Sequence, residues 1–191
     1  AYGTVRMLEM PQARPTGTLE GPSWHLQAVD VTPDGRLLIS GGAHGVVQIW
    51  DVDTERHLHS PVGHTAHVNA VCIAADGALA LSAGDDRTVR VWETAHGSCL
   101  HALEGSRREV KTVCVTPDGK TALSAGVDGK LWLWEPESGR CLRTVEGPGD
   151  PVRAVAITAD GRLALSGAED GVLSLWDTNT GDCLRRLLGH H

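Results

Sequence analysis

Three residues of the chain have the side chains of a nucleophilic triad. His64, Ser82 and Asp86 are the residue types of a Ser-His-Asp hydrolase, in which histidine removes the serine proton and the acid orients the histidine. The serine, however, recurs every 42 residues, at Ser40, Ser82, Ser124 and Ser166. A nucleophile is needed only once and in an exposed, strained position. We therefore interpret these serines as structural and predict that the chain is not an enzyme.

Histidine and glycine, which often build metal and phosphate sites, show no such spacing here. The closest histidine clusters are His57 with His59 and His64 with His67, and neither is paired with a cysteine motif at zinc-ligand spacing. The 23 glycines form neither Gly-x-x-x-x-Gly-Lys-Ser/Thr nor Gly-x-Gly-x-x-Gly before a helix. We therefore predict no metal site and no cofactor.

The five cysteines fall into two classes of equivalent positions. Cys72 and Cys114 share one position, and Cys99, Cys141 and Cys183 share the other. Equivalent positions on neighbouring repeats should lie farther apart than the roughly 7 Å between Cα atoms that a disulfide allows. We expect reduced, half-buried thiols, which fits a cytoplasmic protein, with the nucleus as the alternative.

The same period of 42 residues governs the elements that would position these side chains. Trp50, Trp92, Trp134 and Trp176 repeat at this interval, and each is followed by an acid. An Asp-Gly pair and a further glycine recur at their own fixed offsets. Four complete units follow without insertion or deletion, and they span residues 21–62, 63–104, 105–146 and 147–188.

The two ends of the chain fit the same period. Residues 1–20 align with the second half of a unit, so we predict that they form the third and fourth strands of a degraded preceding unit. Residues 189–191 are either the head of a next unit or the remnant of a tag. Because the chain does not begin with methionine, we expect it to be a piece of a longer protein.

Each unit has the pattern of four short strands. In the second unit, apolar alternation predicts strands over residues 68–73, 78–82, 88–92 and 99–103. The Asp76-Gly77 pair between the first two strands is a strong hairpin signal. No segment shows helical periodicity over three turns, so the predicted fold class is all-β.

The repeat resembles the WD-repeat family. The shared features are a period near 42, four strands per unit, a Gly-His pair at the head and a Trp-Asp pair at the end of the third strand, as in Gly63-His64 and Trp50-Asp51. The resemblance covers essentially the whole chain. It implies a β-propeller with four full four-stranded blades and a partial N-terminal blade.

The resemblance also implies a buried hydrogen-bond chain, or staple, in each blade. The staple links the tryptophan indole, the serine hydroxyl, a head-loop histidine and the aspartate of the second turn. The second unit supplies all four with His64, Ser82, Asp86 and Trp92. The other units keep only part of the set, namely Ser124, Asp128 and Trp134; Ser166, Asp170 and Trp176; and Ser40 and Trp50. Their histidine position holds Ser106, Pro148 or Pro22. We therefore expect the second blade to be the best stapled.

The resemblance further implies a protein-binding face. Partners of WD-repeat proteins often dock on the face that carries the head loops and the second turns. By position, its polar candidates here are His25, Gln27, His67, Asn69, Asp85, Glu109, Lys111, Arg153 and Glu169. These residues vary between units while the scaffold residues stay fixed. Such variation is expected of a surface that each blade uses differently, and equally of one that no blade uses.

The length leaves the number of blades open. Seven units would need about 294 residues, roughly 100 more than the 191 of this chain. We favour part of a larger ring of about seven blades. The alternatives are a half-ring that completes itself by pairing with a second copy, and a small closed ring.

Charge and hydropathy narrow the choice of partners. The net charge of −7 disfavours binding to a nucleic-acid backbone, although it leaves room for a local basic patch. No stretch approaches the roughly 20 apolar residues of a membrane span. We therefore predict a protein-interaction scaffold or regulatory sensor module, with other proteins or peptides as partners and neither nucleic acid nor membrane. The alternative function is a self-assembling structural half-propeller, which would be a homo-oligomer.

Overall fold

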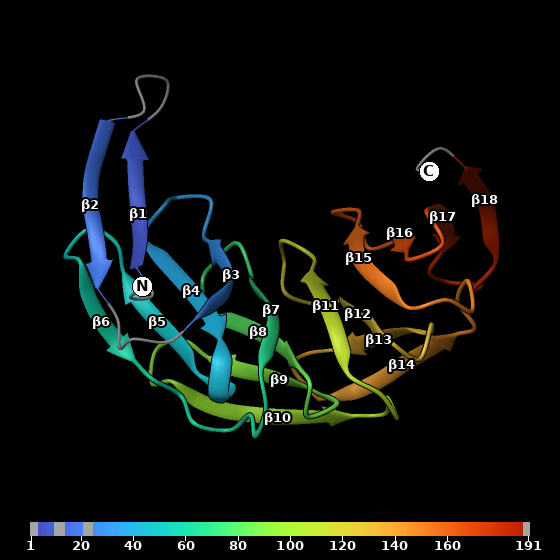
Figure 1. Ribbon diagram of the computed structural model, residues 1–191, viewed down its shortest axis with the longest axis horizontal. Helices are drawn as coiled ribbons and strands as arrows, with labels where there is room; N and C mark the ends of the chain where they lie inside the picture. The colour runs from blue at the N-terminus through green and yellow to red at the C-terminus, as the bar shows by residue number, and fades with distance from the viewer. Residues whose placement is uncertain (1–3, 10–13, 21–24, 189–191) are drawn as a thin grey trace.

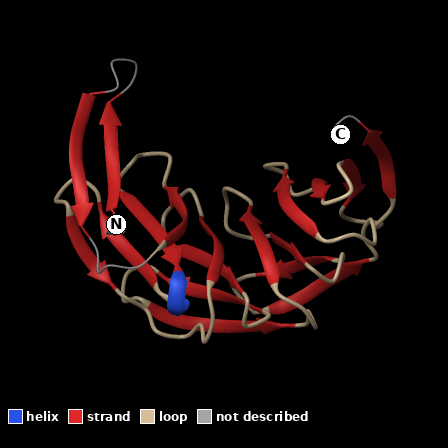
Figure 2. Cartoon of the chain, in the orientation of Figure 1, coloured by secondary structure: helices blue, strands red, loops and turns tan. Residues whose placement is uncertain are grey.

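The computed structural model describes residues 4–9, 14–20 and 25–188, and its regular elements are β-strands and one turn of 3-10 helix at Ala43–Gly45 (Figure 2). The strands form four four-stranded antiparallel sheets and one two-stranded sheet. The sheets follow one another along an arc that is open on one side, with β1 and β2 at one end and β15–β18 at the other (Figure 1). The predicted all-β, propeller-like class is confirmed, and the larger ring of about seven blades stays a prediction.

Each four-stranded sheet contains four consecutive strands in chain order, and we name these sheets blades 1 to 4. The two-stranded sheet pairs β1 (Thr4–Glu9) with β2 (Arg14–Glu20). The blades comprise β3 (Leu26–Val31), β4 (Leu37–Gly42), β5 (Val47–Asp51) and β6 (Arg56–His59); β7 (Val68–Ile73), β8 (Leu79–Gly84), β9 (Thr88–Glu93) and β10 (Ser98–Glu104); β11 (Val110–Val115), β12 (Ala122–Gly126), β13 (Leu131–Glu135) and β14 (Arg140–Val145); and β15 (Val152–Ile157), β16 (Leu163–Ala168), β17 (Val172–Asp177) and β18 (Cys183–Leu188).

The Asp-Gly pairs form the hairpins between the first and second strands. In blade 1, the Thr32 hydroxyl donates to the Asp34 carboxylate at 2.6 Å, and Asp34 also accepts from the Arg36 amide at 3.0 Å. Gly35 has a φ of 75°, in the left-handed region that favours glycine. The same contacts recur in blades 3 and 4 at Thr116 and Asp118, and at Thr158 and Asp160. Local sequence therefore determines these turns.

The hydrophobic core lies mainly between neighbouring blades. At the junction of blades 2 and 3, apolar side chains from all four strands of blade 2 pack against the first three strands of blade 3. The central members are Leu81, Val89, Val91 and Leu103 on one side and Val110, Val113, Ala122 and Trp134 on the other. Equivalent clusters join blades 1 and 2 and blades 3 and 4. A blade thus completes the burial of its apolar face only against the next one.

A second contact joins neighbouring blades at their outer edge. His59 Nε2 donates to the Ala95 carbonyl of the next blade at 3.0 Å, and His101 Nε2 donates to the Glu137 carbonyl at 2.9 Å. Arg143 repeats the contact with the Thr180 carbonyl at 3.1 Å. We call these contacts the outer clasps. Each fastens the fourth strand of one blade to the loop between the third and fourth strands of the following blade.

Blade 1, which adjoins the two-stranded sheet, and blade 4, at the other end of the arc, expose side chains that are buried at the internal junctions. On β3, Val29 is 53% exposed, whereas its equivalents Val71 and Val113 are 8% and 6% exposed. On blade 4, Leu165 is 40% exposed, whereas Leu81 and Leu123 are fully buried. We call these surfaces the N-terminal flank, which contains Val29 and Val31, and the C-terminal flank, which contains Leu165 and Leu187.

Candidate interaction face

The staple of blade 2 is a continuous hydrogen-bond chain through its interior. The Trp92 indole Nε1 donates to the Ser82 hydroxyl at 2.7 Å, and Ser82 lies 2.7 Å from His64 Nε2. His64 Nδ1 lies 2.9 Å from an Asp86 carboxylate oxygen. Asp86 also accepts from the Thr88 hydroxyl at 2.8 Å. The four residues predicted for this staple are thus in contact.

The staple requires a neutral histidine. The carboxylate of Asp86 can only accept, so His64 Nδ1 carries the proton and Nε2 accepts from the Ser82 hydroxyl, whose oxygen already receives the Trp92 N–H. Burial lowers the pKa of His64, although the charge of Asp86 and its hydrogen bond act in the opposite direction. A protonated His64 would donate from both nitrogens and would force the Ser82 hydroxyl to find another acceptor.

The carboxylate at the end of the staple is held in its charged form. Burial alone would raise the pKa of Asp86, but the hydrogen bonds that its carboxylate accepts from Thr65, Thr88 and His64 lower it. The Thr65 amide, which belongs to the loop before β7, donates to Asp86 at 3.1 Å. Asp86 therefore joins this loop to the turn between β8 and β9.

In blade 3 the predicted residues form two separate parts. Trp134 Nε1 donates to Ser124 at 2.9 Å, while Ser106 donates to Asp128 at 2.9 Å. The shorter Ser106 stands where blade 2 has His64, and no described bond links Ser106 to Ser124. Trp132 instead donates to Asp128 at 3.3 Å and stacks on Trp134 with 5.8 Å between ring centroids.

Blades 1 and 4 keep only the inner part of the staple. Trp176 donates to Ser166 at 2.9 Å, and Trp50 donates to Ser40 at 3.3 Å. Asp170 caps its own turn by accepting from the Val172 amide at 3.0 Å. Pro148 offers no side-chain donor, and Pro22 lies outside the described residues.

The staples and turns build one face of the arc. We call it the head-loop face; it consists of the loops before the first strand of each blade (residues 63–67, 105–109 and 147–151) and the turns between the second and third strands (residues 43–45, 85–87, 127–129 and 169–171). In each blade an amide of the turn donates to a carbonyl at the end of the head loop, as Asp85 does to His67 at 2.8 Å and Val127 to Glu109 at 3.0 Å. The backbone of this face is therefore fixed while its side chains vary.

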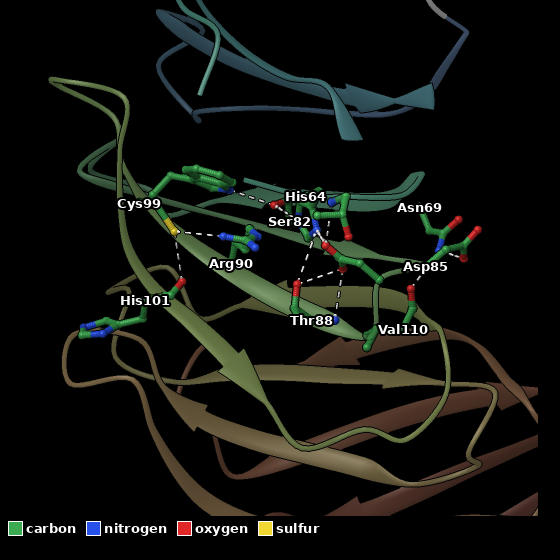
Figure 3. Close-up of polar contacts among 12 residues, drawn as sticks. His64, Asn69, Ser82, Asp85, Thr88, Arg90, Cys99, His101 and Val110 are labelled. Carbon is green, nitrogen blue, oxygen red and sulfur yellow. Dashed lines mark hydrogen bonds and ion pairs between the residues drawn. The ribbon is translucent and has the colours of Figure 1, made fainter. Parts of the chain in front are cut away.

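Three of the predicted face residues form a network between blades 2 and 3. Asn69 Nδ2 donates to the Asp85 carboxylate at 2.7 Å and to the Val110 carbonyl at 2.9 Å (Figure 3). Lys111 Nζ forms an ion pair with the same Asp85 oxygen at 2.5 Å. Burial alone would raise the pKa of Asp85, but hydrogen bonds from Asn69 and Lys111 outweigh it and lower that pKa. These half-buried groups hold the junction of blades 2 and 3 together.

The other predicted face residues lie apart from this network, and all of them except Glu109 are exposed. Arg153 Nε donates to Glu169 at 2.7 Å on blade 4, and both side chains are exposed. His25 and Gln27 are exposed on blade 1. His67 is exposed and its ring lies 6.0 Å from that of His44. Glu109 is half-buried. The structure thus spreads the predicted set over four blades and does not gather it into one pocket.

The cysteines differ in part from the prediction. Cys72 is buried and Cys114 is half-buried, and burial raises the pKa of the Cys114 thiol to about 12. The fourth-strand cysteines Cys99, Cys141 and Cys183 are exposed rather than half-buried, so that expectation was wrong. The fourth strand is the outer strand of each blade and lacks a neighbour on its far side.

The described part of the chain offers no evident metal centre. Within residues 4–9, 14–20 and 25–188, no group of three or more His, Cys, Asp or Glu side chains is placed to hold a metal ion. No helix in the same part is long and apolar enough to span a membrane.

Four stretches of the chain match one family model. Residues 13–51, 55–93, 97–135 and 139–177 each match the model described as WD domain, G-beta repeat. The chain belongs to the WD-repeat family. No curated protein matches it significantly. WD repeats generally serve as scaffolds for protein–protein interaction, and proteins of this family are typically not enzymes.

Each matched WD repeat spans two neighbouring sheets. The stretch 55–93 begins with β6, the outer strand of blade 1, and ends with β9, the third strand of blade 2. The stretches 97–135 and 139–177 are offset in the same way. Consecutive blades are thereby linked through the chain as well as through their cores.

Some functional contacts were not predicted from the WD-repeat pattern. The outer clasps of His59, His101 and Arg143 follow the same period of 42 residues, so the spacing was a usable signal. Trp132 takes a position that holds Arg90 in blade 2, and only the packing of the two sheets reveals that its ring can reach Asp128.

Proposed function

We propose that this chain is a protein-interaction scaffold that presents its head-loop face to other proteins or peptides, either as a hub or as a sensor module of a larger protein. The supporting observation is the contrast between a fixed backbone and variable side chains on this face. The turn amides bond to the head loops in every described blade, whereas the side chains differ from blade to blade. A rigid frame with exposed, varied polar groups favours specific recognition because little conformational entropy is lost on binding.

Site-specific photo-crosslinking tests this proposal directly. A photoreactive amino acid placed at His67 lies on the head-loop face, and one at Arg153 lies beside Glu169 at its border. The same amino acid at Lys120 or Arg162 lies on the turns at the opposite end of the strands. The proposal predicts a protein adduct from the first pair, identified by mass spectrometry, and none from the second. Adducts confined to Lys120 and Arg162 would refute a head-loop site.

We propose a second role for the flanks, namely pairing with a second copy of the chain. The supporting observation is that both flanks expose the residue classes that meet at the internal junctions. Leu187 is 51% exposed, whereas its equivalents Leu103 and Val145 are 3% and 5% exposed. Arg185 stands where Arg143 forms an outer clasp, and its side chain makes no described contact. The N-terminal flank also borders a groove of about 510 Å³ lined by Val5, Met7, Val29, Val31 and Leu38, among others.

Light scattering with matched leucine variants tests the flank pairing. Each buried leucine contributes about 1.5–3 kcal/mol, so Leu165→Arg with Leu187→Arg should convert an oligomer into a monomer. Leu142→Arg is the control, because Leu142 is exposed to a similar degree but lies at the internal junction of blades 3 and 4 and not on a flank. A wild-type protein that is well folded and strictly monomeric would exclude this second role.

A further inference from the structure

Arg87 adopts a backbone conformation that the repeat otherwise reserves for glycine. Its φ is 70°, and the equivalent residues of the other blades are Gly45, Gly129 and Gly171, with φ values of 76°, 71° and 79°. A side chain in this left-handed region is strained, and such strain is concentrated at functional sites. The fold alone would favour glycine here, and Arg87 departs from that preference.

The turn that contains Arg87 lies next to the head loop of blade 3. A Cβ built on Gly45 would meet the His64 carbonyl, and one built on Gly129 would meet the Gly149 carbonyl at 2.8 Å. The turn of each blade thus lies against the next head loop. In blade 2 the Asp85–Lys111 ion pair joins this turn to the strand that follows residues 106–108, so Arg87 lies in the loop next to the one that holds Arg107 and Arg108.

The three arginines lie in two adjoining loops at the junction of blades 2 and 3, and we call them the basic cluster. Arg87, Arg107 and Arg108 are exposed, and their side chains make no hydrogen bond or ion pair with any described residue. The equivalent positions at the other described junctions hold no arginine, since they are Gly45, Thr65 and Ala66, and Gly129, Gly149 and Asp150. The cluster is therefore a departure from the repeat in both charge and conformation.

Most of the carboxylates near the three arginines already have other hydrogen-bond or ion-pair partners. Asp85 is paired with Lys111, Asp86 belongs to the staple of blade 2, and Asp128 accepts from Ser106 and Trp132. Glu109 is the remaining carboxylate on this head loop. Three guanidinium groups from two loops therefore remain available to an outside anion, in a chain whose net charge is −7.

We propose that Arg87, Arg107 and Arg108 bind a phosphorylated serine or threonine segment of a partner protein on the head-loop face. One carboxylate satisfies a single bidentate arginine, whereas a phosphate carries nearly two charges and three acceptor oxygens, which suits several arginines at once. Recognition of phosphorylated motifs by arginine clusters is an established physical mode of peptide binding. This inference rests on the proposed scaffold function and specifies the chemistry of the partner.

Fluorescence anisotropy with a labelled peptide tests this inference. The probe is a short peptide that carries two phosphoserines, and its unphosphorylated form and a glutamate form serve as comparisons. Loss of one charge-assisted contact should weaken binding of the phosphopeptide about tenfold in Arg87→Gly, and more in the double variant Arg107→Ser with Arg108→Ser. Arg162→Ser, on the opposite face, should bind as the wild type does.

The stability of the variants separates binding from folding. Glycine is the residue of the other three blades at this position, so Arg87→Gly should melt at or above the wild-type temperature while it loses affinity. Equal binding of the phosphorylated and unphosphorylated peptides, or unchanged binding in Arg87→Gly, would overturn the inference. So would a single-stranded RNA that binds as tightly and with the same dependence on the arginines.

Photo-crosslinking separates failure of the phosphate inference from failure of the proposed scaffold function. If only the phosphate inference fails, a partner will still crosslink at His67 or Arg153 in the Arg87→Gly variant. If the scaffold proposal fails, no adduct forms on the head-loop face in any variant.

Discussion

His64 and Ser106 occupy the same position in neighbouring blades and show what one side chain contributes to a repeat. His64 spans the distance between Ser82 and Asp86, so the interior of blade 2 is tied to its surface turn. Ser106 reaches only Asp128, so the hydrogen-bond chain of blade 3 is divided into two separate parts, Ser106–Asp128 and Trp134–Ser124. The longer ring of histidine is what completes the staple.

Replacing His64 should therefore destabilise the protein much more than replacing Ser106. His64→Ala leaves the Ser82 hydroxyl without its acceptor and removes a donor to the Asp86 carboxylate, which should cost about 2–4 kcal/mol. Ser106→Ala removes a half-buried bond and should cost about 1 kcal/mol. Thermal or urea unfolding measures both values. An unchanged melting temperature in His64→Ala would contradict the structural role of the staple.

The staple should also make stability depend on pH in a defined direction. Because burial lowers the pKa of His64 below that of the unfolded chain, the unfolded state binds the proton more readily. The contribution of His64 is thus fully present above the unfolded pKa of about 6.5 and is lost as the pH falls below it. Urea unfolding of the wild type and His64→Ala from pH 8 to pH 5 should show the difference between them shrinking. A constant difference would contradict a neutral His64.

Single residues also mark the limit of prediction from sequence. The members of the blade 2 staple follow from the repeat pattern, because each occupies a fixed offset from its tryptophan. The ion pair of Lys111 with Asp85 and the bond of Asn69 to Val110 do not, since they join different blades. Their formation depends on how closely two sheets pack, which is not encoded in the pattern within one unit.

Each blade is a complete antiparallel sheet. The outer clasps show how one blade restrains the next. The donor of each clasp lies on a fourth strand, and the acceptor lies in the loop between the third and fourth strands of the following blade. The histidine rings also pack against glycines of that loop, Gly97 for His59 and Gly139 for His101. A clasp therefore restrains a loop that its own blade leaves exposed.

Removing one clasp should loosen the adjacent loop without unfolding the blade. His101→Ala should increase the rate of amide hydrogen exchange in residues 135–139 by about fivefold, which corresponds to the loss of a hydrogen bond worth about 1 kcal/mol. Exchange in the equivalent loop of blade 2, residues 93–97, should not change because His59 remains. Equal effects on both loops would contradict a local clasp.

The strands of each blade could be predicted from sequence because turns and alternation are local. The Asp-Gly hairpins and the apolar alternation define strands 1 and 2, as in β7 and β8. The exposure of the fourth-strand cysteines could not be predicted in the same way. It depends on β10, β14 and β18 being the edge strands of their sheets, which is a property of how the strands pair.

The whole molecule is an open arc of WD-repeat blades with one face that is framed by backbone hydrogen bonds (Figure 1). The repeated junctions determine the curvature, since each blade packs on the next through the same set of positions. The number of blades in a closed ring was not determined by the sequence, because closure depends on what covers Val29 and Leu165. The head-loop face lies at the ends of the strands and not on the flanks, so it stays accessible both in a larger ring and in a pair of two copies.

The most direct test of the account is the affinity of a crosslinked partner for variants of the two faces. The partner identified by photo-crosslinking is titrated by calorimetry against His67→Ala with Arg153→Ala, and against Lys120→Ala with Arg162→Ala. Loss of well-placed interface contacts should weaken binding to the head-loop variant by at least about tenfold, while the opposite-face variant binds like the wild type. Unchanged affinity in the head-loop variant, together with weakened binding in the opposite-face variant, would contradict the central claim.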